Sequence, residues 1–467
     1  MLSDFLKSRK QDAKDLVLEL RKAFKYVSIL GTDVRVQTVT ANVKSTQITD
    51  EGLSSECGFV VKMKNDNSFF EYSLDDIKGD KKELAKRIID SLKIDSDLAK
   101  KMIQTKDIKD EPLEKSFVRE SDLDNYSVSD KLNFVKNLQK ELQGKSEFIL
   151  NAIFRLSTLN VSKIFITENK NLDQNYTWVN GYLLLIYGEN NKLVECRESA
   201  FDHTVKKTME DMPKLMDKLL DKAHHLAYAK PITPGVYDVI TDPSITGLIA
   251  HEAFGHGVEM DQFVKDRALA KEYVGKYVAS PIVNMRDGAA STLSAASYFF
   301  DDDGILAQDT LIIKDGILVS GISDMASALQ LGTNPTGNGR REAFDHKAYT
   351  RMTNTFFLPG KDKLQDMIKS VKHGYYICET NNGMEDPKNW AIQCVAEYGI
   401  EIIDGHLTDN WVSPVVMSGY VPDLLKSISM VSDGLEIEGA GACGKGYKEW
   451  VRVTDGGPSL KAKVKLG

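Results

Sequence analysis

Two histidines and a glutamate within one short segment carry the most specific chemical signal in this sequence. They lie in His251-Glu252-Ala253-Phe254-Gly255-His256. Neutral imidazoles are common zinc ligands, and a catalytic zinc site keeps one position open for water. A carboxylate beside such a site can take a proton from that water. The residue types therefore fit a metal-dependent hydrolase, although two buried histidines can also be ordinary hydrogen-bonded core residues.

The spacing of the two histidines differs from the zinc-peptidase helix His-Glu-x-x-His, whose ligands are four residues apart. Here they are five apart, so a regular α-helix would point them about 140° away from each other. A wider turn with an i→i+5 hydrogen bond would bring them to one side. Gly255 and Gly257 would ease that distortion by freeing the backbone. We expect a helix near residues 244–256 that widens or ends near His256.

A third protein ligand must come from elsewhere in the chain. Cys443 stands apart because it lies among the glycines of residues 439–446, where the backbone can approach a bound group closely. The neighbouring Lys445 would help to hold a thiolate, which is the form that binds metal. From the residues alone, Cys443 remains open as a ligand or as a free structural thiol. The other candidates are the many carboxylates and the remaining histidines and cysteines, namely His203, His224, His225, His346, His373, His406, Cys57, Cys196, Cys378 and Cys394.

Two other patterns resemble binding motifs but lack a necessary part. Gly439 and Gly444-Lys445 have the spacing of a phosphate loop, but Gly446 replaces the Ser or Thr that binds Mg²⁺. Residues 447–453 alternate like a strand instead of opening a helix. Asp301-Asp302-Asp303 lacks the alternating spacing of a calcium loop, so we expect a solvated turn there.

Composition limits the class of protein. The chain has 467 residues, 42% of them hydrophobic, and a net charge of −8, which favours a globular protein and disfavours broad nucleic-acid binding. No apolar run is long enough to span a bilayer, and the N-terminus lacks the apolar core of a secretory signal. The five scattered cysteines do not form a disulfide framework. We therefore expect a cytoplasmic protein without membrane or direct nucleic-acid partners.

The periodicity of apolar residues predicts an α+β fold with two domains. Helical spacing covers residues 1–25, 76–104, 130–144 and 202–228, and strands are expected within 33–73 and 148–197. The charged stretch 105–130 is expected to be a solvated loop, with one more exposed helix as the alternative. The prolines and glycine of residues 230–235 mark the boundary between an N-terminal domain, 1–229, with an antiparallel sheet and a strand-rich C-terminal domain, 230–467. Asp-Gly hairpins at 315–316 and 404–405 and a helix near 361–372 belong to the second domain.

Five runs of residues in the C-terminal half resemble, in order, the TldD/PmbA family of metallopeptidases, which has been labelled modulator of DNA gyrase. The N-terminal half agrees in pattern and length only. The resemblance favours the catalytic TldD-like branch, because the non-catalytic partner type lacks the histidine motif. The matching runs are Thr246 to Gly257, Asp302 to Gln308, Gly337 to Arg341, Arg351 to Thr355 and Ala442 to Lys445.

The resemblance implies one Zn²⁺ per catalytic subunit, held by His251, His256 and Cys443, with Glu252 as the general base that activates a zinc-bound water. It further implies cleavage of unfolded peptides or unstructured polypeptides. The assembly would be a homodimer or a heterodimer with a PmbA/TldE-like subunit. Residues 351–354 are candidates for polar contacts to an extended substrate, although an ordinary strand is an equal alternative.

Two other functions remain open from the sequence. One is a non-catalytic regulatory binding protein that keeps the metal as a structural element, which would require protein groups at all four metal positions. The other is a metal hydrolase that cleaves amides other than peptide bonds. A catalytic site differs from the first alternative in leaving one coordination position open.

Overall fold

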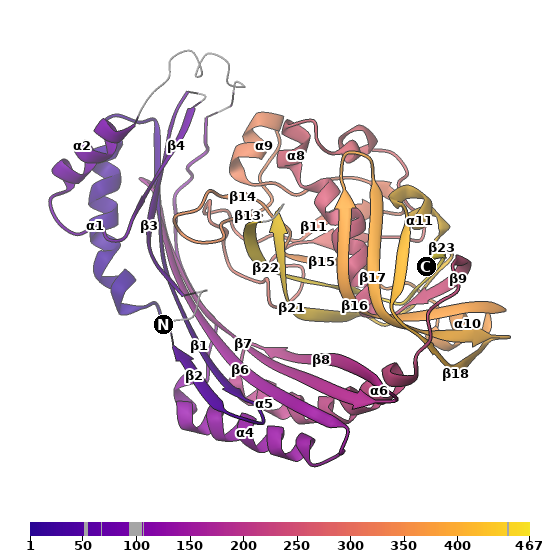
Figure 1. Ribbon diagram of the computed structural model, residues 1–467. Coiled ribbons are helices and arrows are strands. Elements are labelled where there is room, and N and C mark those ends of the chain that lie inside the picture. The colour runs from indigo at the N-terminus through magenta and orange to yellow at the C-terminus, as the bar shows by residue number, and fades with distance from the viewer. Residues whose placement is uncertain (51–54, 67, 93–104, 106, 446–447) are drawn as a thin grey trace.

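The computed structural model describes residues 1–50, 55–66, 68–92, 105, 107–445 and 448–467. A long curved sheet from the N-terminal half lies against a set of shorter sheets from the C-terminal half (Figure 1). The mixture of helices and strands in both halves confirms the predicted α+β class. The division into domains at residues 229 and 230 stays a prediction. None of the described helices is long and apolar enough to cross a membrane.

The N-terminal sheet is built on two very long strands. β6 (Ile149–Ile166) and β7 (Lys170–Glu189) pair along their whole length, and β6 also pairs with β1 (Tyr26–Ala41). All pairings are antiparallel except that of β5 with β7. The sheet is completed by β2 (Thr46–Asp50), β3 (Glu56–Asn65), β4 (Ser68–Leu74), β5 (Leu113–Val118) and β8 (Lys192–Asp202).

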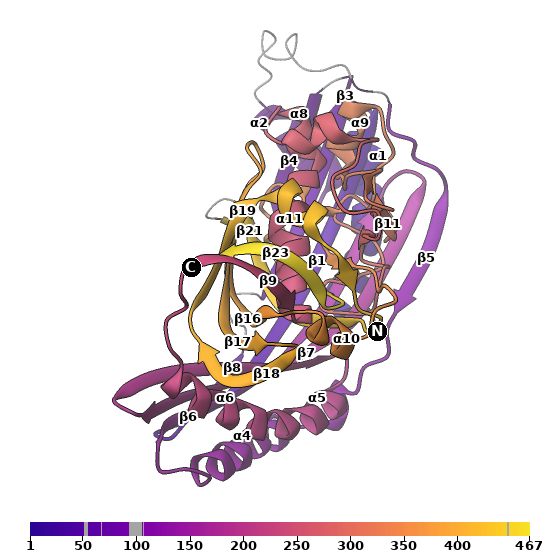
Figure 2. The same cartoon turned by 90° about the vertical axis from the view of Figure 1, so that its right-hand side faces the viewer.

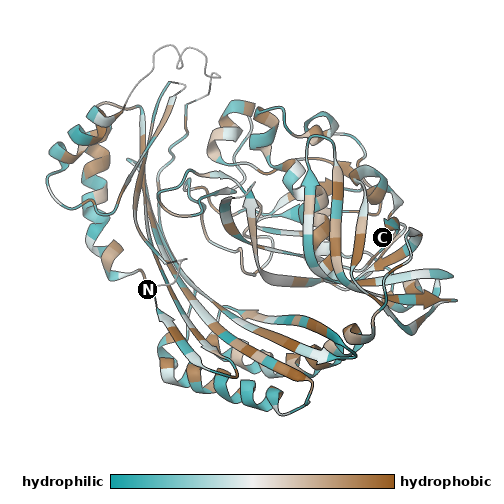
Figure 3. Cartoon of the chain, in the orientation of Figure 1, coloured by the Kyte–Doolittle hydropathy of each residue, from teal (hydrophilic) through white to brown (hydrophobic). Residues whose placement is uncertain are grey.

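Amphipathic helices cover this sheet near its two ends (Figures 1 and 2). Ser3 caps α1 by accepting a hydrogen bond from the Leu6 N–H, and Ser127 with Asp130 forms a capping box that starts α4. Apolar and polar residues alternate along the long strands (Figure 3), as expected for a sheet with one face against helices. The helices are α1 (Asp4–Leu20), α2 (Lys81–Ser91), α4 (Val128–Gln143), α5 (Val205–Asp211) and α6 (Leu215–Tyr228), with short 3₁₀ turns η1 (Leu123–Asn125) and η2 (Met212–Lys214).

Five strands of the C-terminal half close into a ring, since β16 pairs with both β9 and β17. The other pairings in the ring join β9 to β23, β23 to β19 and β19 to β17. These strands are β9 (Gly235–Thr241), β16 (His373–Asp386), β17 (Ala391–Ile403), β19 (Val415–Tyr420) and β23 (Leu460–Leu466), with β18 (His406–Val412) and β20 (Met430–Val431) paired at the side.

A second C-terminal sheet has the strand order β12-β11-β10-β15-β22-β21 and ends on a hairpin of two strands. Helix α7 (Pro243–Leu248) packs between this sheet and the ring, because it contacts both β22 and β16. The strands are β10 (Met285–Asp287), β11 (Thr310–Lys314), β12 (Ile317–Leu318), β15 (Asn354–Phe357), β21 (Glu436–Lys445) and β22 (Lys448–Gly457), and β13 (Gly339–Arg340) pairs with β14 (Tyr349–Thr350). The remaining helices are α8 (Met260–Val264), η5 (Leu269–Tyr273), α9 (Met325–Leu331), α10 (Leu364–Lys369) and α11 (Val421–Ser427).

The expected elements are mostly present, and both Asp-Gly hairpins are confirmed. Asp315 and Gly316, and Asp404 and Gly405, all have positive φ values at the turns between β11 and β12 and between β17 and β18. The stretch 105–130 is not one solvated loop, because β5 adds to the sheet beside β7 and η1 follows. The part of the predicted helix 76–104 that covers residues 93–104 lies outside the described residues.

The turn Asp301-Asp302-Asp303 joins the two halves, and the prediction of a solvated turn is wrong. The three residues are only 2%, 7% and 1% exposed. Lys62 on β3 forms a buried ion pair with Asp303, and Lys163 Nζ on β6 lies 2.5 Å from Asp302 Oδ1. The sequence could not reveal these cations, because they are more than 100 residues away along the chain.

This connection predicts a large loss of stability for Lys62→Met. The substitution leaves the buried Asp303 carboxylate without its cation, and losing one partner of a buried pair costs about 3–5 kcal/mol. Urea denaturation measures the change in the free energy of unfolding. Lys7→Met is the matched control, because its pair with Asp4 is exposed and contributes about 1 kcal/mol or less. Equal effects of the two substitutions would contradict a structural role for the pair.

Candidate metal centre

The segment that carries both histidines is a widened helical turn. Asp242 caps α7 by accepting a hydrogen bond from the Ile245 N–H, and the helix continues as a π-helix, η3 (Ile249–Gly255). The His256 N–H donates to the His251 carbonyl, which is an i→i+5 hydrogen bond. The chain then tightens into a 3₁₀ turn, η4 (His256–Val258). The predicted widening of the helix is therefore confirmed, and it brings the two imidazole centroids to 5.2 Å from each other.

Gly255 contributes space, and its backbone has an ordinary helical conformation with φ −59°. A Cβ atom at this position would lie 2.1 Å from Met352 Sδ. The expectation that backbone freedom explains this glycine is therefore wrong. The close approach of Met352, on the segment before β15, requires a residue without a side chain.

His251, His256 and Cys443 come together although the cysteine is 187 residues beyond His256. One ligand atom from each residue lies within 4.8 Å of the others, and Cys443 Sγ lies 3.2 Å from His256 Nε2. Cys443 is on β21 near the end of the hairpin, and it is buried like His251. The same three residues are those that the family resemblance implies as ligands, and their role as ligands stays a prediction.

The electrostatics of this cluster favour a thiolate. Burial raises the pKa of the Cys443 thiol, but the adjacent His251 and His256 imidazoles lower it to about 4. The thiolate in turn raises the pKa of His256 well above its ordinary value, against the opposing effect of burial. A thiolate with two imidazoles is a donor set that suits zinc. The residues present therefore fit the metal that the motif implies.

Glu259 contacts His256 at Nδ1, the ring nitrogen away from Cys443, and is not among the residues predicted from the sequence. Its Oε2 lies 3.2 Å from His256 Nδ1 and 3.0 Å from Lys445 Nζ. A hydrogen bond at Nδ1 leaves Nε2 free to face Cys443, as outer carboxylates do for metal-binding histidines. The i,i+3 spacing from His256 was a usable signal. The sequence predicts that Lys445 helps to hold a thiolate, but the Lys445 ammonium pairs with Glu259 and Asp261 instead.

Glu252 lies beside both histidines. Its carboxylate oxygens are 3.9 Å from His251 Nε2 and 4.0 Å from His256 Nε2. Burial raises the pKa of Glu252 above its ordinary value. Strand β16 passes closely over it, since a Cβ at Gly383 would lie 2.5 Å from Glu252 Cγ. The carboxylate is therefore positioned to exchange a proton with a molecule held at the centre.

Residues 351–354 hold the protein together and do not present their side chains to a substrate. The Arg351 guanidinium donates to the Cys443 carbonyl at 2.8 Å and to the Glu449 carbonyl, so it fixes the β21–β22 hairpin. Thr353 donates to Asp287 through its hydroxyl and its backbone N–H. The idea that these side chains contact substrate is wrong, because they are buried and already bonded.

The other candidate ligands lie in different surroundings. His224 pairs with Glu189, and His225 stacks on Trp411. His346 lies 3.4 Å from both Glu342 and Glu449, in a separate and more exposed group. Within the described part of the chain, none of the other cysteines joins the cluster around Cys443; these free thiols are Cys57, Cys196, Cys378 and Cys394.

Comparison with known proteins identifies the family to which the chain is related. Residues 234–465 match the family model of the PmbA/TldA metallopeptidase C-terminal domain. The chain belongs to the TldD/PmbA family. It is 31% identical over 254 residues to a metalloprotease of Methanothermobacter thermautotrophicus, covering 54% of this chain and 55% of the relative. It is 29% identical over 235 residues to a zinc metalloprotease TldD homolog of Saccharolobus solfataricus, covering 50% and 52%. The chain thus spans about half the length of these two relatives.

A solved structure shows the same fold over nearly the whole molecule. TldE from Thermococcus kodakarensis has a TM-score of 0.76 and 17% sequence identity, and the match covers 98% of this chain and 100% of that one. The N-terminal half of this family member, which the family model does not include, therefore also has a fold found in TldE. At this identity the likeness is one of fold alone.

Cobalt binding tests the role of Cys443 in this family member. A thiolate bound to Co²⁺ produces a charge-transfer absorption in the near ultraviolet, and Cys443→Ser removes the sulfur that causes it. We expect the cobalt-loaded protein to show this band and the Cys443→Ser protein to lack it. Cys57→Ser is the matched control, because Cys57 is also a free thiol but does not belong to the cluster. A band that persists in Cys443→Ser would assign the thiolate ligand to another residue.

Proposed function

We propose that this protein is a zinc-dependent peptidase that hydrolyses peptide bonds in unstructured polypeptides or peptides. The observation that carries the proposal is the convergence of His251, His256 and Cys443 beside the Glu252 carboxylate. The relatives named metalloprotease support the same reading.

The arrangement favours a catalytic centre over a purely structural metal site. Among the described residues, the cluster has three ligand groups, and three protein ligands leave a fourth position for water or substrate. A structural zinc site fills all four positions with protein groups. Glu252 adds the carboxylate that a hydrolytic centre needs and that a structural site does not.

Different residues around the centre would bind the metal, transfer protons and orient a ligand. Zinc, when bound, supplies a Lewis acid that polarises a carbonyl and lowers the pKa of water. His251, His256 and Cys443 would hold it. Glu252 takes a proton from the attacking water and gives a proton to the leaving amine. Glu259 holds the imidazole of His256 in the orientation that presents Nε2.

An extended substrate suits the position of β21. This strand is the last in the order of its sheet, and within the described residues it pairs with β22 on one side. A peptide that adds to such an edge is bound through its backbone, so that many sequences are accepted alike. Cys443 lies on the same strand, so a peptide beside β21 passes the metal centre.

The proposal also covers the oligomeric state and the cellular location of the protein. We propose a homodimer or a heterodimer with a PmbA/TldE-like subunit, and the likeness to TldE supports a partner of that fold. The free thiols support a reducing cytoplasm. The net charge of −8 supports the absence of a direct nucleic-acid partner.

Glu252→Gln tests the proposed reaction. The amide cannot accept a proton but has nearly the same shape, so we expect zinc to be retained and hydrolysis to fall by about 10²–10⁴-fold. Zinc content is measured by elemental analysis, and hydrolysis with a chemically unfolded, fluorescently labelled polypeptide. Glu210→Gln is the control, because Glu210 is exposed on α5. Undiminished cleavage by Glu252→Gln would overturn the role of Glu252, and a wild-type protein without cleavage would overturn the peptidase.

A further inference from the structure

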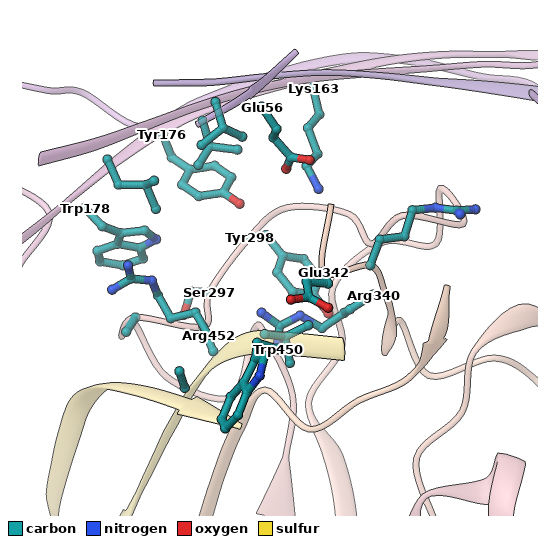
Figure 4. A pocket seen from close by; sticks show the side chains of 18 of the residues that line it. Glu56, Lys163, Tyr176, Trp178, Ser297, Tyr298, Arg340, Glu342, Trp450 and Arg452 are labelled. Carbon is teal, nitrogen blue, oxygen red and sulfur yellow. The ribbon is translucent and has the colours of Figure 1, made fainter. Parts of the chain in front are cut away.

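A cavity of about 270 Å³ lies between the N-terminal sheet and the β21–β22 hairpin (Figure 4). One wall comes from β6 and β7 and includes Tyr176 and Trp178. The facing wall includes Tyr298 and, on β22, Trp450 and Arg452. The two halves of the chain therefore build this cavity together, and neither half encloses it alone.

Arg452 is a cation without a partner in this cavity. Its guanidinium makes no hydrogen bond or ion pair with any side chain or backbone group in the described part of the chain. Figure 4 shows it reaching from the hairpin toward Trp178. Burial lowers the pKa of Arg452, and the positive charge of Arg340 lowers it further. A partly buried charge is unfavourable unless an opposite charge pairs with it.

Of the other cations in the cavity wall, Lys163 and Arg341 have carboxylate partners and Arg340 has none in the described structure. Lys163 pairs with Asp302, and Arg341 pairs with Glu71. Arg340 donates to the Met352 carbonyl at 2.7 Å, which does not neutralise its charge. Two uncompensated guanidinium groups, those of Arg340 and Arg452, are thus present in the cavity.

The two acidic groups in the wall are also bonded. Glu56 accepts a hydrogen bond from the Phe344 N–H at 2.6 Å, and Glu342 accepts one from the Glu449 N–H at 2.8 Å. Neither forms an ion pair with Arg452 in the described structure. An anion that enters the cavity would therefore find the guanidinium of Arg452 available.

The register of the hairpin places the cavity and the metal centre on opposite faces of the same two strands. Cys443 pairs with Val451, and Ala442 pairs with Arg452. Successive side chains of a strand point to opposite faces. Cys443 therefore faces His256, while Ala442 and Arg452 face the cavity. A peptide alongside β21 would direct alternate side chains to the metal centre and to the cavity.

We propose that this cavity is a substrate subsite that binds a carboxylate of the peptide, with the Arg452 guanidinium as its main partner and Arg340 beside it. The inference rests on the proposed peptidase function and names the class of substrate, a peptide with a negative charge near the cleaved bond. A guanidinium binds a carboxylate through two parallel hydrogen bonds, which makes the pairing specific. The carboxylate comes from an acidic side chain or from the C-terminus of the peptide.

Binding to the full-length protein after removal of metal with a chelator tests this subsite without requiring hydrolysis. The probes are short unstructured peptides that carry Glu or Gln at one position at a time, each with a free or an amidated C-terminus. The fluorescence of Trp178 and Trp450, which line the cavity, reports binding. We expect one Glu peptide, or the free-acid peptides, to bind about tenfold more tightly than the matched neutral peptide, as a charged hydrogen-bonded pair allows.

Substitutions connect the preference to Arg452. In Arg452→Gln the preference for the carboxylate is expected to disappear. In Arg452→Lys it is expected to weaken, because lysine keeps the charge but cannot form the two parallel hydrogen bonds of a guanidinium. Arg155→Gln on the exposed side of β6 is the matched control and should keep the preference. A preference for Glu at one position identifies a side chain as the source, and a preference for the free acid identifies the C-terminus.

Several results would overturn the subsite. They are equal binding of charged and neutral peptides, a preference that survives Arg452→Gln, or binding of inorganic phosphate with no discrimination among peptides. Hydrolysis by the zinc-loaded protein separates this failure from that of the proposed function. Cleavage without a charge preference would support the peptidase function and contradict the subsite. A charge preference in binding without any cleavage would support the subsite and contradict the peptidase function.

Discussion

The contact between the Cys443 thiolate and the two imidazoles is the interaction on which the rest of the centre depends. A buried thiolate is unfavourable by itself, and the positive charge that His251 and His256 can carry makes it possible. The histidines meet only because one helical turn is widened, and the cysteine reaches them only because the β21–β22 hairpin folds back over that turn.

Much of the surrounding structure serves to hold this contact in place. Arg351 donates a hydrogen bond to the carbonyl of Cys443 and so helps to fix the strand that carries the thiolate. Glu259 joins His256 to Lys445, and Lys445 belongs to the same hairpin as Cys443. The helical turn and the hairpin are thus linked twice, once by the contact of Cys443 with His256 and once by the contacts of Glu259 with His256 and Lys445. The aspartate turn at 301–303 fixes the N-terminal sheet against this half of the chain, and that contact also forms the Arg452 cavity.

The sequence predicts what is local and misses what joins distant segments. The widened turn follows from the five-residue spacing of His251 and His256, and the Asp-Gly hairpins follow from their turn residues. The role of Cys443 came from the family resemblance, because 187 residues separate it from His256 and no spacing rule applies. The prediction of a solvated aspartate turn is wrong because the lysines that compensate its buried charges lie far away in the sequence, on β3 and β6. The candidate role of Arg351 in substrate contact is wrong for the same reason, because its partners, two carbonyl groups and Glu259, leave no trace in the sequence.

The coordination of zinc by these residues is the central claim, and X-ray absorption spectroscopy at the zinc edge measures it most directly. The zinc-loaded protein should show one sulfur neighbour at about 2.3 Å together with nitrogen and oxygen neighbours at about 2.0–2.1 Å. One sulfur, two imidazoles and one lighter ligand would agree with a centre made by His251, His256 and Cys443 with an open position. A spectrum without a sulfur neighbour, or a protein that does not bind zinc, would contradict it.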